Sequence, residues 1–239
     1  LANWARHAYG VAQEAAYDPA NAGWVRCGGT WFVGVDALPN DEQGRLPDGP
    51  VLEGSAIAAA RAVADPPLHR AQASVMYPGY PMQDDDEGDA AFGFRLRRDA
   101  AHVDGLHRIM PGRRRLLKER HAWILGIPLN DCEAAPLSVW EGSHEVMRCA
   151  LSEAYSSIAP SDWAHHDITD AYQAARKRCF ETLQRVEVCA KIGEAYLVHR
   201  LALHGVAPWG AAAGEHRAVA YFRPELIDGA DSGVWLTAP

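Results

Sequence analysis

The sequence lacks any run of eighteen apolar residues, and this absence predicts no membrane-spanning helix and no membrane partner. Its N-terminus lacks a basic flank followed by an apolar core, so it is not expected to be a signal peptide. The five cysteines are widely scattered, and no two of them form a CxxC pair. A zinc ribbon or a disulfide framework is therefore not expected, and a reducing, cytoplasmic location fits better.

Positive charge and phosphate-binding motifs are also scarce. The formal net charge is -8, and an acidic surface repels phosphate backbones, so nucleic acid is a disfavoured partner. No GxGxxG motif and no P-loop motif follows a predicted strand, which argues against a nucleotide-phosphate cradle and against a Rossmann sheet.

The apolar patterning predicts a chain rich in short strands. The 239 residues are 48% hydrophobic and 23% charged, as in an ordinary globular protein of one large or two small domains. Helical patterns cover residues 1–20, 54–64 and 168–187. Strand patterns cover residues 28–41, 69–81, 90–100, 121–130, 135–144, 191–205 and 216–226. Because the strands mostly follow one another through short loops, they favour an antiparallel double sheet or barrel with helices in front.

A candidate metal site begins at His102-Val103-Asp104. Residues two apart in an extended segment point to the same side, so His102 and Asp104 would present an imidazole nitrogen and a carboxylate oxygen to one pocket. A second histidine from a distant strand would complete a two-histidine, one-carboxylate face. That face suits non-haem Fe(II), which needs open positions for a cosubstrate and dioxygen.

Two later residues supply the context for this site. His204 closes an apolar strand just before Gly205 and is the expected third ligand. Arg217, thirteen residues later, starts a strand in which every second residue shares its face. A buried arginine needs an anion, and its guanidinium group could pair with the far carboxylate of a dicarboxylate such as 2-oxoglutarate.

Together with two further motifs, these residues resemble the phytanoyl-CoA dioxygenase-like branch of the Fe(II)/2-oxoglutarate-dependent oxygenases. The four motifs are HVD at 102–104, the stretch from AWILG to Gly-Ser-His at 122–144, KIGEAYLVH at 191–199, and LHGVAPWGAAAGEHR at 203–217. They occur in the family's order and span about residues 95–224, over half of the chain.

The resemblance implies a fold that is mainly β with flanking helices, namely the double-stranded β-helix or cupin-like jelly roll. It further implies a single domain over 1–239, in which residues 1–90 flank a jelly-roll core at 91–239. The core would carry the metal site.

The resemblance also implies the site residues and the reaction. His102, Asp104 and His204 would bind Fe(II), Arg217 would pair with 2-oxoglutarate, and Trp123 would lie near this cosubstrate. The implied reaction uses dioxygen to hydroxylate a small molecule and releases succinate and CO2. Related halogenases carry a small residue in place of the carboxylate, so the aspartate favours hydroxylation.

The chain departs from the family at Val206 and Trp209, where Ser and Asn often follow the distal His-Gly. Other polar residues have ordinary expected roles. His199 has an odd spacing from the distal ligand, so it is expected on the opposite face of its strand. Arg223 is expected in a surface salt bridge near Glu225, and the basic stretch at 112–120 in a solvated loop.

Three alternatives stay open. A cupin-like metalloenzyme would not use 2-oxoglutarate, but such proteins tend to bring three or four histidines. A nucleic-acid demethylase of the same superfamily ends in a similar Arg-x5-Arg pattern, although the acidic net charge favours a small-molecule substrate. A non-catalytic jelly-roll binding protein would not need iron. The oligomeric state is left open.

Overall fold

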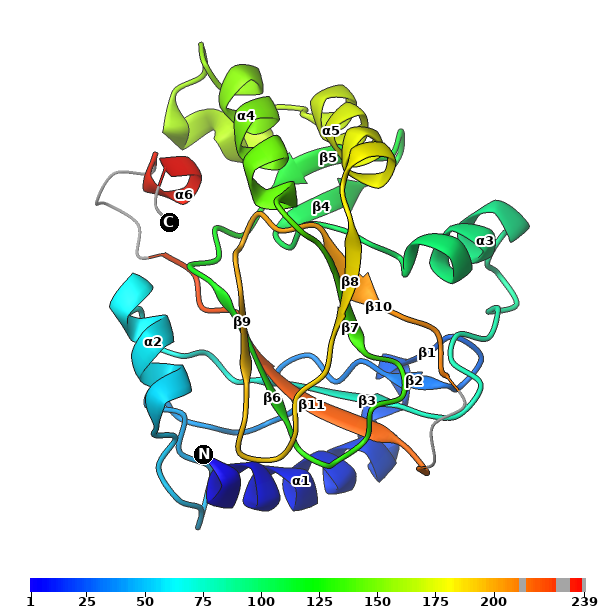
Figure 1. Cartoon of the computed structure of the whole chain (residues 1–239), viewed down its shortest axis with the longest axis vertical. Coiled ribbons are helices and arrows are strands. Elements are labelled where there is room, and N and C mark those ends of the chain that lie inside the picture. Colours follow the sequence, from blue (N-terminus) through cyan, green and yellow to red (C-terminus); the bar gives the residue numbers. More distant parts are fainter. Residues whose placement is uncertain (211–213, 227–232, 238–239) are drawn as a thin grey trace.

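Two antiparallel sheets form the centre of the molecule (Figure 1). The computed structural model describes residues 1–210, 214–226 and 233–237, so residues 211–213 of the fourth motif lie outside the described residues. The larger sheet has the strand order β1-β2-β3-β11-β6-β9, the smaller sheet has the order β10-β7-β8, and β4 and β5 form a separate hairpin. The strands are β1 (Val25–Arg26), β2 (Trp31–Phe32), β3 (Gln72–Met76), β4 (Leu106–Ile109), β5 (Arg114–Leu117), β6 (Ile124–Pro128), β7 (Leu137–Trp140), β8 (Arg185–Val188), β9 (Tyr196–Val198), β10 (His204–Val206) and β11 (Arg217–Phe222).

The chain visits the two sheets in the order of a double-stranded β-helix. From β3 in the larger sheet it passes through His102, which forms an isolated antiparallel bridge with His204 of β10. It then returns to the larger sheet at β6, crosses to β7 and β8, goes back to β9, crosses to β10 and ends at β11. The expected fold class, a mainly β jelly roll with flanking helices, is confirmed.

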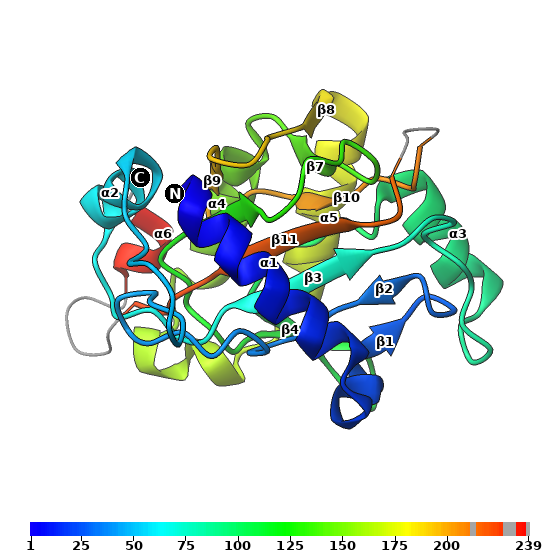
Figure 2. The ribbon, with the colours of Figure 1, turned by 90° about the horizontal axis from the view of Figure 1, so that it is seen from below.

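Strand β11 shows how the two faces of the larger sheet differ. Ala218, Ala220 and Phe222 pack in a core beneath the helices, whereas Val219 packs against the smaller sheet. Successive strand side chains point to opposite faces, so helices close one face and the other lines the space between the sheets. Figure 2 shows α1 lying across β3 and β11 on the helix-covered side.

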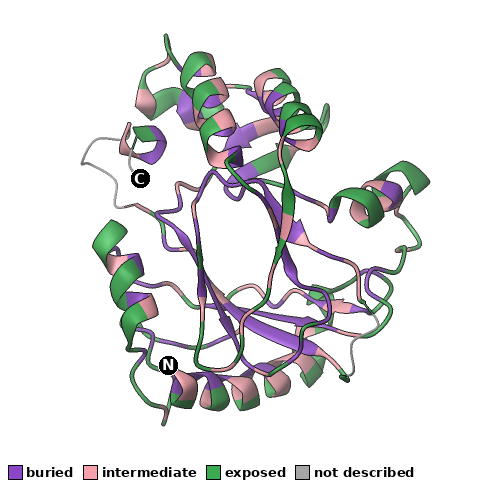
Figure 3. Ribbon diagram, in the orientation of Figure 1, coloured by how far each residue is buried: buried purple, intermediate pink, exposed green. Residues whose placement is uncertain are grey.

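Helices cover both outer sides of the jelly roll. Helix α1 buries a stripe of mostly small residues against the larger sheet, because helical positions about four apart share one face. Helices α4 and α5 and the β4–β5 hairpin enclose a second core beyond the smaller sheet. In Figure 3 the strands are mostly buried and the outer sides of the helices are exposed. The helical segments are α1 (Ala2–Tyr17), η1 (Pro19–Trp24), α2 (Ser55–Val63), α3 (Asp89–Arg98), α4 (Ser143–Ala154), η2 (Pro160–His165), α5 (Thr169–Thr182) and α6 (Val234–Thr237).

The prediction of a strand at 90–100 is wrong, because this segment forms helix α3. Its alternating apolar residues suggested a strand, but the helix places Asp89 in the first turn and arginines in the last turn. Both placements suit the helix dipole. Phe94 packs edge-on against Phe180 of α5, with ring centroids 6.1 Å apart. Tertiary packing therefore outweighs the local alternation.

Two other expectations also differ from the structure. The basic stretch at 112–120 is not only a loop, since Leu116 and Leu117 of β5 are buried and pair with β4. The expected boundary at residue 90 does not coincide with the edge of the sheet, because β3 pairs along β11. The first 90 residues thus supply a strand of the jelly roll itself.

Within the described part of the chain, no helix is both long and apolar enough to cross a membrane. All five cysteines are free thiols.

Candidate metal centre

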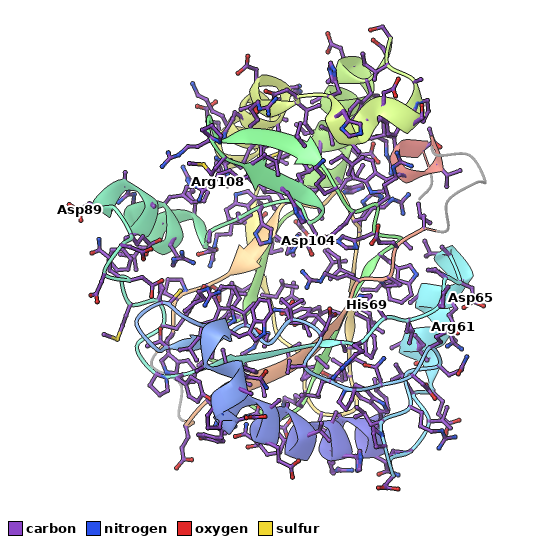
Figure 4. The ribbon with its side chains drawn as sticks, turned by 180° about the vertical axis from the view of Figure 1, so that it is seen from behind. Arg61, Asp65, His69, Asp89, Asp104 and Arg108 are labelled. Atoms are coloured by element: carbon purple, nitrogen blue, oxygen red, sulfur yellow. The ribbon has the colours of Figure 1, made fainter. Side chains whose placement is uncertain are left out.

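His102, Asp104 and His204 converge between the two sheets, and we call them the Asp104 cluster. The Nε2 atom of His102 lies 3.0 Å from Oδ1 of Asp104, and the Nε2 atom of His204 lies 3.7 Å from Oδ2. The three ligand atoms lie within 4.8 Å of one another, and among the described residues no other group of this kind is found. In Figure 4 Asp104 lies in the interior, whereas Asp65 and Asp89 lie at the periphery.

Backbone pairing brings the two histidines together. His102 and His204 exchange two backbone hydrogen bonds, of 2.9 and 3.1 Å. Val103 lies between His102 and Asp104 in the sequence, and its side chain is buried in the core beyond the smaller sheet. The side chains of the HVD motif therefore alternate between two faces, as expected. Gly205 is required beside the distal histidine, because a Cβ atom there would collide with the backbone carbonyl of Asp99.

The backbone also selects the tautomer of both histidines. Nδ1 of His102 lies 3.1 Å from the carbonyl oxygen of Ala100, and Nδ1 of His204 lies 2.9 Å from that of Ala202. A carbonyl can only accept, so each Nδ1 carries the hydrogen and donates it. A hydrogen on Nδ1 leaves the lone pair of each Nε2 for an ion bound between it and Asp104, which is the state that a metal ligand requires.

Charges around the cluster keep Asp104 ionised and His204 neutral. Burial alone would raise the pKa of Asp104, but neighbouring groups, with Arg223 the largest contributor among them, outweigh it and hold this pKa well below its usual range. Burial lowers the pKa of His204. At neutral pH the cluster therefore offers one anionic oxygen and neutral imidazole at position 204.

Arg223 belongs to this site, and the expected salt bridge with Glu225 is a wrong prediction. Its Nη1 lies 3.4 Å from Oδ2 of Asp104, and its Nη2 donates to Oε1 of Gln72 at 2.5 Å. The signal was present in the sequence, because Arg223 follows Arg217 by six residues on one strand face.

The cluster opens into a cavity of about 180 Å³ whose walls are largely apolar and aromatic. Residues from the first 90 positions, which carried no recognised motif, form part of this wall. Trp31, for example, donates its indole hydrogen to Ser74 of β3 at 3.0 Å. The lining residues are Trp31, Val33, Val35, Gln72, Ser74, Tyr80, Asp99, Ala100, His102, Asp104, Ile124, Leu137, Val198, His204, Gly205, Val206, Tyr221 and Arg223.

Arg217 does not line this cavity and instead contacts Tyr196 and Tyr221. Its side chain is buried, and Nη2 donates to the hydroxyl of Tyr196 at 3.2 Å. Nη1 is also buried and has no hydrogen-bond partner among the described residues. Tyr221, on the same strand face, lines the cavity, whereas Arg217 does not.

The structure places Trp123 away from the cavity, which corrects the expectation that it lies near a cosubstrate. Its indole nitrogen donates to the carbonyl oxygen of Ala64 at 2.9 Å, and its ring packs in the core beneath α1 and α2. The next residue, Ile124, lines the cavity instead. Neighbouring residues of an extended segment point to opposite faces, and Trp123 is on the outer one.

The other histidines lie outside the cavity. His199 is near α4, with its ring centroid 4.8 Å from that of His144. It lies away from the metal ligands as expected, but the reason differs, because the expected single strand at 191–205 is two strands, β9 and β10, and His199 lies between them. Val206 lines the cavity and Trp209 packs beside it near Tyr80. The departures from the family pattern therefore make this part of the wall more apolar.

Comparisons with known proteins find a resemblance in structure but not in sequence. No protein-family model matches this chain, and no curated protein sequence matches it. Among solved structures, the non-heme alpha ketoglutarate dependent carbocyclase SnoK from nogalamycin biosynthesis matches with 17% identity and a TM-score of 0.46, over 94% of this chain and 79% of that one. A likeness at this level does not define an activity, so the function rests on the residues of the site.

Proposed function

We propose that this protein is an Fe(II)- and 2-oxoglutarate-dependent oxygenase that hydroxylates a small molecule, using dioxygen and releasing succinate and CO2. The observation that carries the proposal is the Asp104 cluster. One ligand atom from each of two imidazoles and one carboxylate lie within 4.8 Å of one another at the wall of an apolar cavity.

The donor set fits Fe(II) better than a closed structural metal site. Two histidines and one carboxylate occupy one face of an octahedral ion and leave other positions open. When bound there, iron would supply the activation of dioxygen. The residues of this chain would hold the metal, orient the substrate and exclude water. Arg223 would keep Asp104 ionised as a ligand.

The buried guanidinium group fits a dicarboxylate cosubstrate. Arg217 Nη1 has no partner among the described residues, and an unpaired buried charge is costly. A carboxylate that enters from the cavity would supply the missing acceptor. The keto-acid end of 2-oxoglutarate would then face the Asp104 cluster.

The cavity walls support a small, largely apolar substrate. Val206, Leu137 and Val198 present apolar groups to the same space as the cluster. Burial of such groups favours a ligand with matching apolar surface. The order of the four sequence motifs supports the phytanoyl-CoA dioxygenase-like branch of the class. The scattered free cysteines fit a reducing cytoplasm.

An anaerobic titration with Fe(II) and 2-oxoglutarate tests the proposal. We expect a weak visible charge-transfer band in the wild-type protein and its loss in His204→Ala. A matched control is His199→Ala, which removes a histidine of the same segment that faces away from the cavity. Under air, the wild-type protein should convert 2-oxoglutarate to succinate.

The titration also separates the alternatives. Binding of Fe(II) without any effect of 2-oxoglutarate would indicate a cupin-like metalloenzyme that uses another cosubstrate. Failure to bind Fe(II), with ligand binding unaffected by chelators, would instead indicate a non-catalytic binding protein. Either result would overturn the oxygenase proposal.

A further inference from the structure

One wall of the metal cavity comes from the first 90 residues, and no sequence motif assigns it a role. We call it the β3 wall, and its residues are Trp31, Val33, Val35, Gln72, Ser74 and Tyr80. None of these residues belongs to the Asp104 cluster. The β3 wall is therefore available to recognise a substrate held beside the metal ligands.

Gln72 presents an oriented amide group to the cavity. It lies on β3 and is 7% exposed. Its Oε1 accepts a hydrogen bond from Nη2 of Arg223 at 2.5 Å, and Arg223 also contacts Asp104. A guanidinium group can only donate, so the amide oxygen must face Arg223. The amide nitrogen then carries two hydrogens for which no acceptor is found among the described residues.

Ser74 adds a second donor to the same wall. Residues two apart on a strand share one face, and Ser74 is buried like Gln72. Its Oγ accepts the indole hydrogen of Trp31 at 3.0 Å, whereas its own hydrogen has no acceptor in the described part of the chain. Because the indole hydrogen is used in this contact, Trp31 offers the cavity apolar ring surface. Tyr80 lies edge-on to Trp31, with ring centroids 6.0 Å apart.

The charges around the β3 wall favour an uncharged acceptor for these donors. Arg223, the arginine next to Gln72, is paired with Asp104 at 3.4 Å. Asp99, which also lines the cavity, is paired with Arg185 at 2.5 Å. A carboxylate or phosphate at this wall would meet no unpaired cation among the described lining residues, and the loss of its hydration would be costly. An uncharged carbonyl oxygen accepts the same hydrogen bonds without that cost.

We propose that the substrate is an uncharged, largely apolar carbonyl compound and that Gln72 and Ser74 bind its carbonyl oxygen. This inference rests on the proposed function and names the substrate class of that site. Gln72 is the main specificity residue, because Arg223 fixes the direction in which its amide donates. Trp31 and Tyr80 supply apolar surface around the carbonyl group.

Equilibrium dialysis of matched probes against the full chain tests the substrate class. Acetophenone carries the carbonyl group, α-methylstyrene has the same shape without an acceptor, benzoate adds a charge and 1-phenylethanol adds a donor. We expect wild-type protein to bind acetophenone roughly tenfold tighter than α-methylstyrene or benzoate, because only acetophenone satisfies the buried donors without bringing a charge.

Variants of the two donors should change this preference in different ways. In Gln72→Glu the preference for acetophenone over α-methylstyrene should fall by roughly tenfold, and 1-phenylethanol should bind tighter than acetophenone, because a carboxylate accepts hydrogen bonds and does not donate them. Ser74→Ala leaves the contact between Gln72 and Arg223 in place and should lower the same preference by a smaller factor, about threefold.

Gln173→Glu is the matched control, because Gln173 also accepts a hydrogen bond from an arginine, Arg176 at 2.7 Å, but is exposed on α5. It should leave every affinity unchanged, and thermal unfolding reports whether each variant keeps the fold. Equal wild-type affinities for acetophenone and α-methylstyrene, tightest binding of benzoate, or binding of no probe would each overturn the substrate class. An unchanged preference in folded Gln72→Glu would overturn the role of Gln72. The dialysis needs neither Fe(II) nor 2-oxoglutarate and the anaerobic titration needs no probe, so failure of the substrate class and failure of the oxygenase function are distinguishable.

Discussion

The chain brings two imidazoles to one carboxylate in two places. The first place is the Asp104 cluster, and the second is the Glu119 cluster, formed by His107, Glu119 and His121. The nitrogen–oxygen distances are similar, at 3.0 and 3.7 Å in the first and 3.3 and 3.1 Å in the second. Their surroundings differ, because the side chain of Asp104 is 7% exposed and that of Glu119 is 41% exposed. Only the Asp104 cluster opens into the apolar cavity.

The position of the imidazole hydrogen separates the two clusters further. In the Asp104 cluster each Nδ1 donates to a backbone carbonyl two residues earlier, which frees Nε2 for a metal. In the Glu119 cluster, Nδ1 of His121 is buried and has no partner among the described residues. Its Nε2 lies 3.1 Å from the Glu119 carboxylate and carries the hydrogen that it donates. Similar residue types thus give a candidate metal site in one place and an ion-paired group in the other.

Removing the carboxylate from each cluster in turn should give the largest difference in Fe(II) affinity between the two clusters. We expect Asp104→Ala to weaken Fe(II) binding by more than about 100-fold, since even residues that only support metal ligands change affinity by about 10- to 100-fold. Glu119→Ala should leave Fe(II) affinity unchanged. Anaerobic Fe(II) titration measures both, and an equal loss in the two variants would contradict the distinction.

Replacing Arg223, the cation beside Asp104, should shift the pH dependence of Fe(II) affinity. Protons compete with the metal for a ligating carboxylate, and Arg223 helps to hold the pKa of Asp104 low against the effect of burial. In Arg223→Met this pKa rises, so on acidification Fe(II) affinity should begin to fall at a higher pH than in the wild-type protein. The measurement is Fe(II) affinity as a function of pH, with the exposed Arg6→Met as control. An unchanged profile would show that Arg223 does not govern the ionisation of Asp104.

The smallest expected effect concerns the stability that Glu119 contributes. Its hydrogen bond with His121 is the main cause that lowers the pKa of Glu119 from 4.5 to about 2. A carboxylate with a lowered pKa in the folded state stabilises the fold above its unfolded pKa, and this contribution is lost as the pH falls toward the folded pKa.

Urea unfolding of wild-type protein and Glu119→Gln at pH 5 and at pH 2 tests this contribution. We expect a difference of about 1 kcal/mol at pH 5, reduced by solvent screening because the carboxylate is partly exposed. The difference should disappear near pH 2. A difference that grows on acidification would reverse the assigned sign.

Much of the fold could be predicted from the sequence where the pattern is local. The alternation in 216–226 correctly predicts that Arg217 and Tyr221 share one face of β11. The expected strands at 121–130 and 135–144 are found as β6 and β7. The same reasoning failed at 90–100, where Phe94 packs against α5 in a helix. Apolar alternation over a short segment does not distinguish a strand from a helix, because the packing partner that buries the apolar side chains is not encoded in the segment itself.

The candidate site was partly predictable for the same reason. The two-residue period of an extended chain places His102 and Asp104 on one side. His204 could be predicted as the third ligand because it closes an apolar strand just before Gly205. Trp123 was misplaced because a motif position does not define which face of the strand its side chain takes. Arg223 was assigned to the surface because its contact with Asp104 joins residues 119 positions apart.

By itself, the amino-acid sequence determined which chemical groups are present and which near neighbours point the same way, since strand geometry repeats every two residues. Only the tertiary structure decided which imidazole nitrogens face a backbone carbonyl, which cation accompanies the buried carboxylate and which residues of β11 line the cavity. These properties depend on carbonyl groups and side chains brought together by backbone pairing between distant strands, and no spacing along the chain encodes their distances.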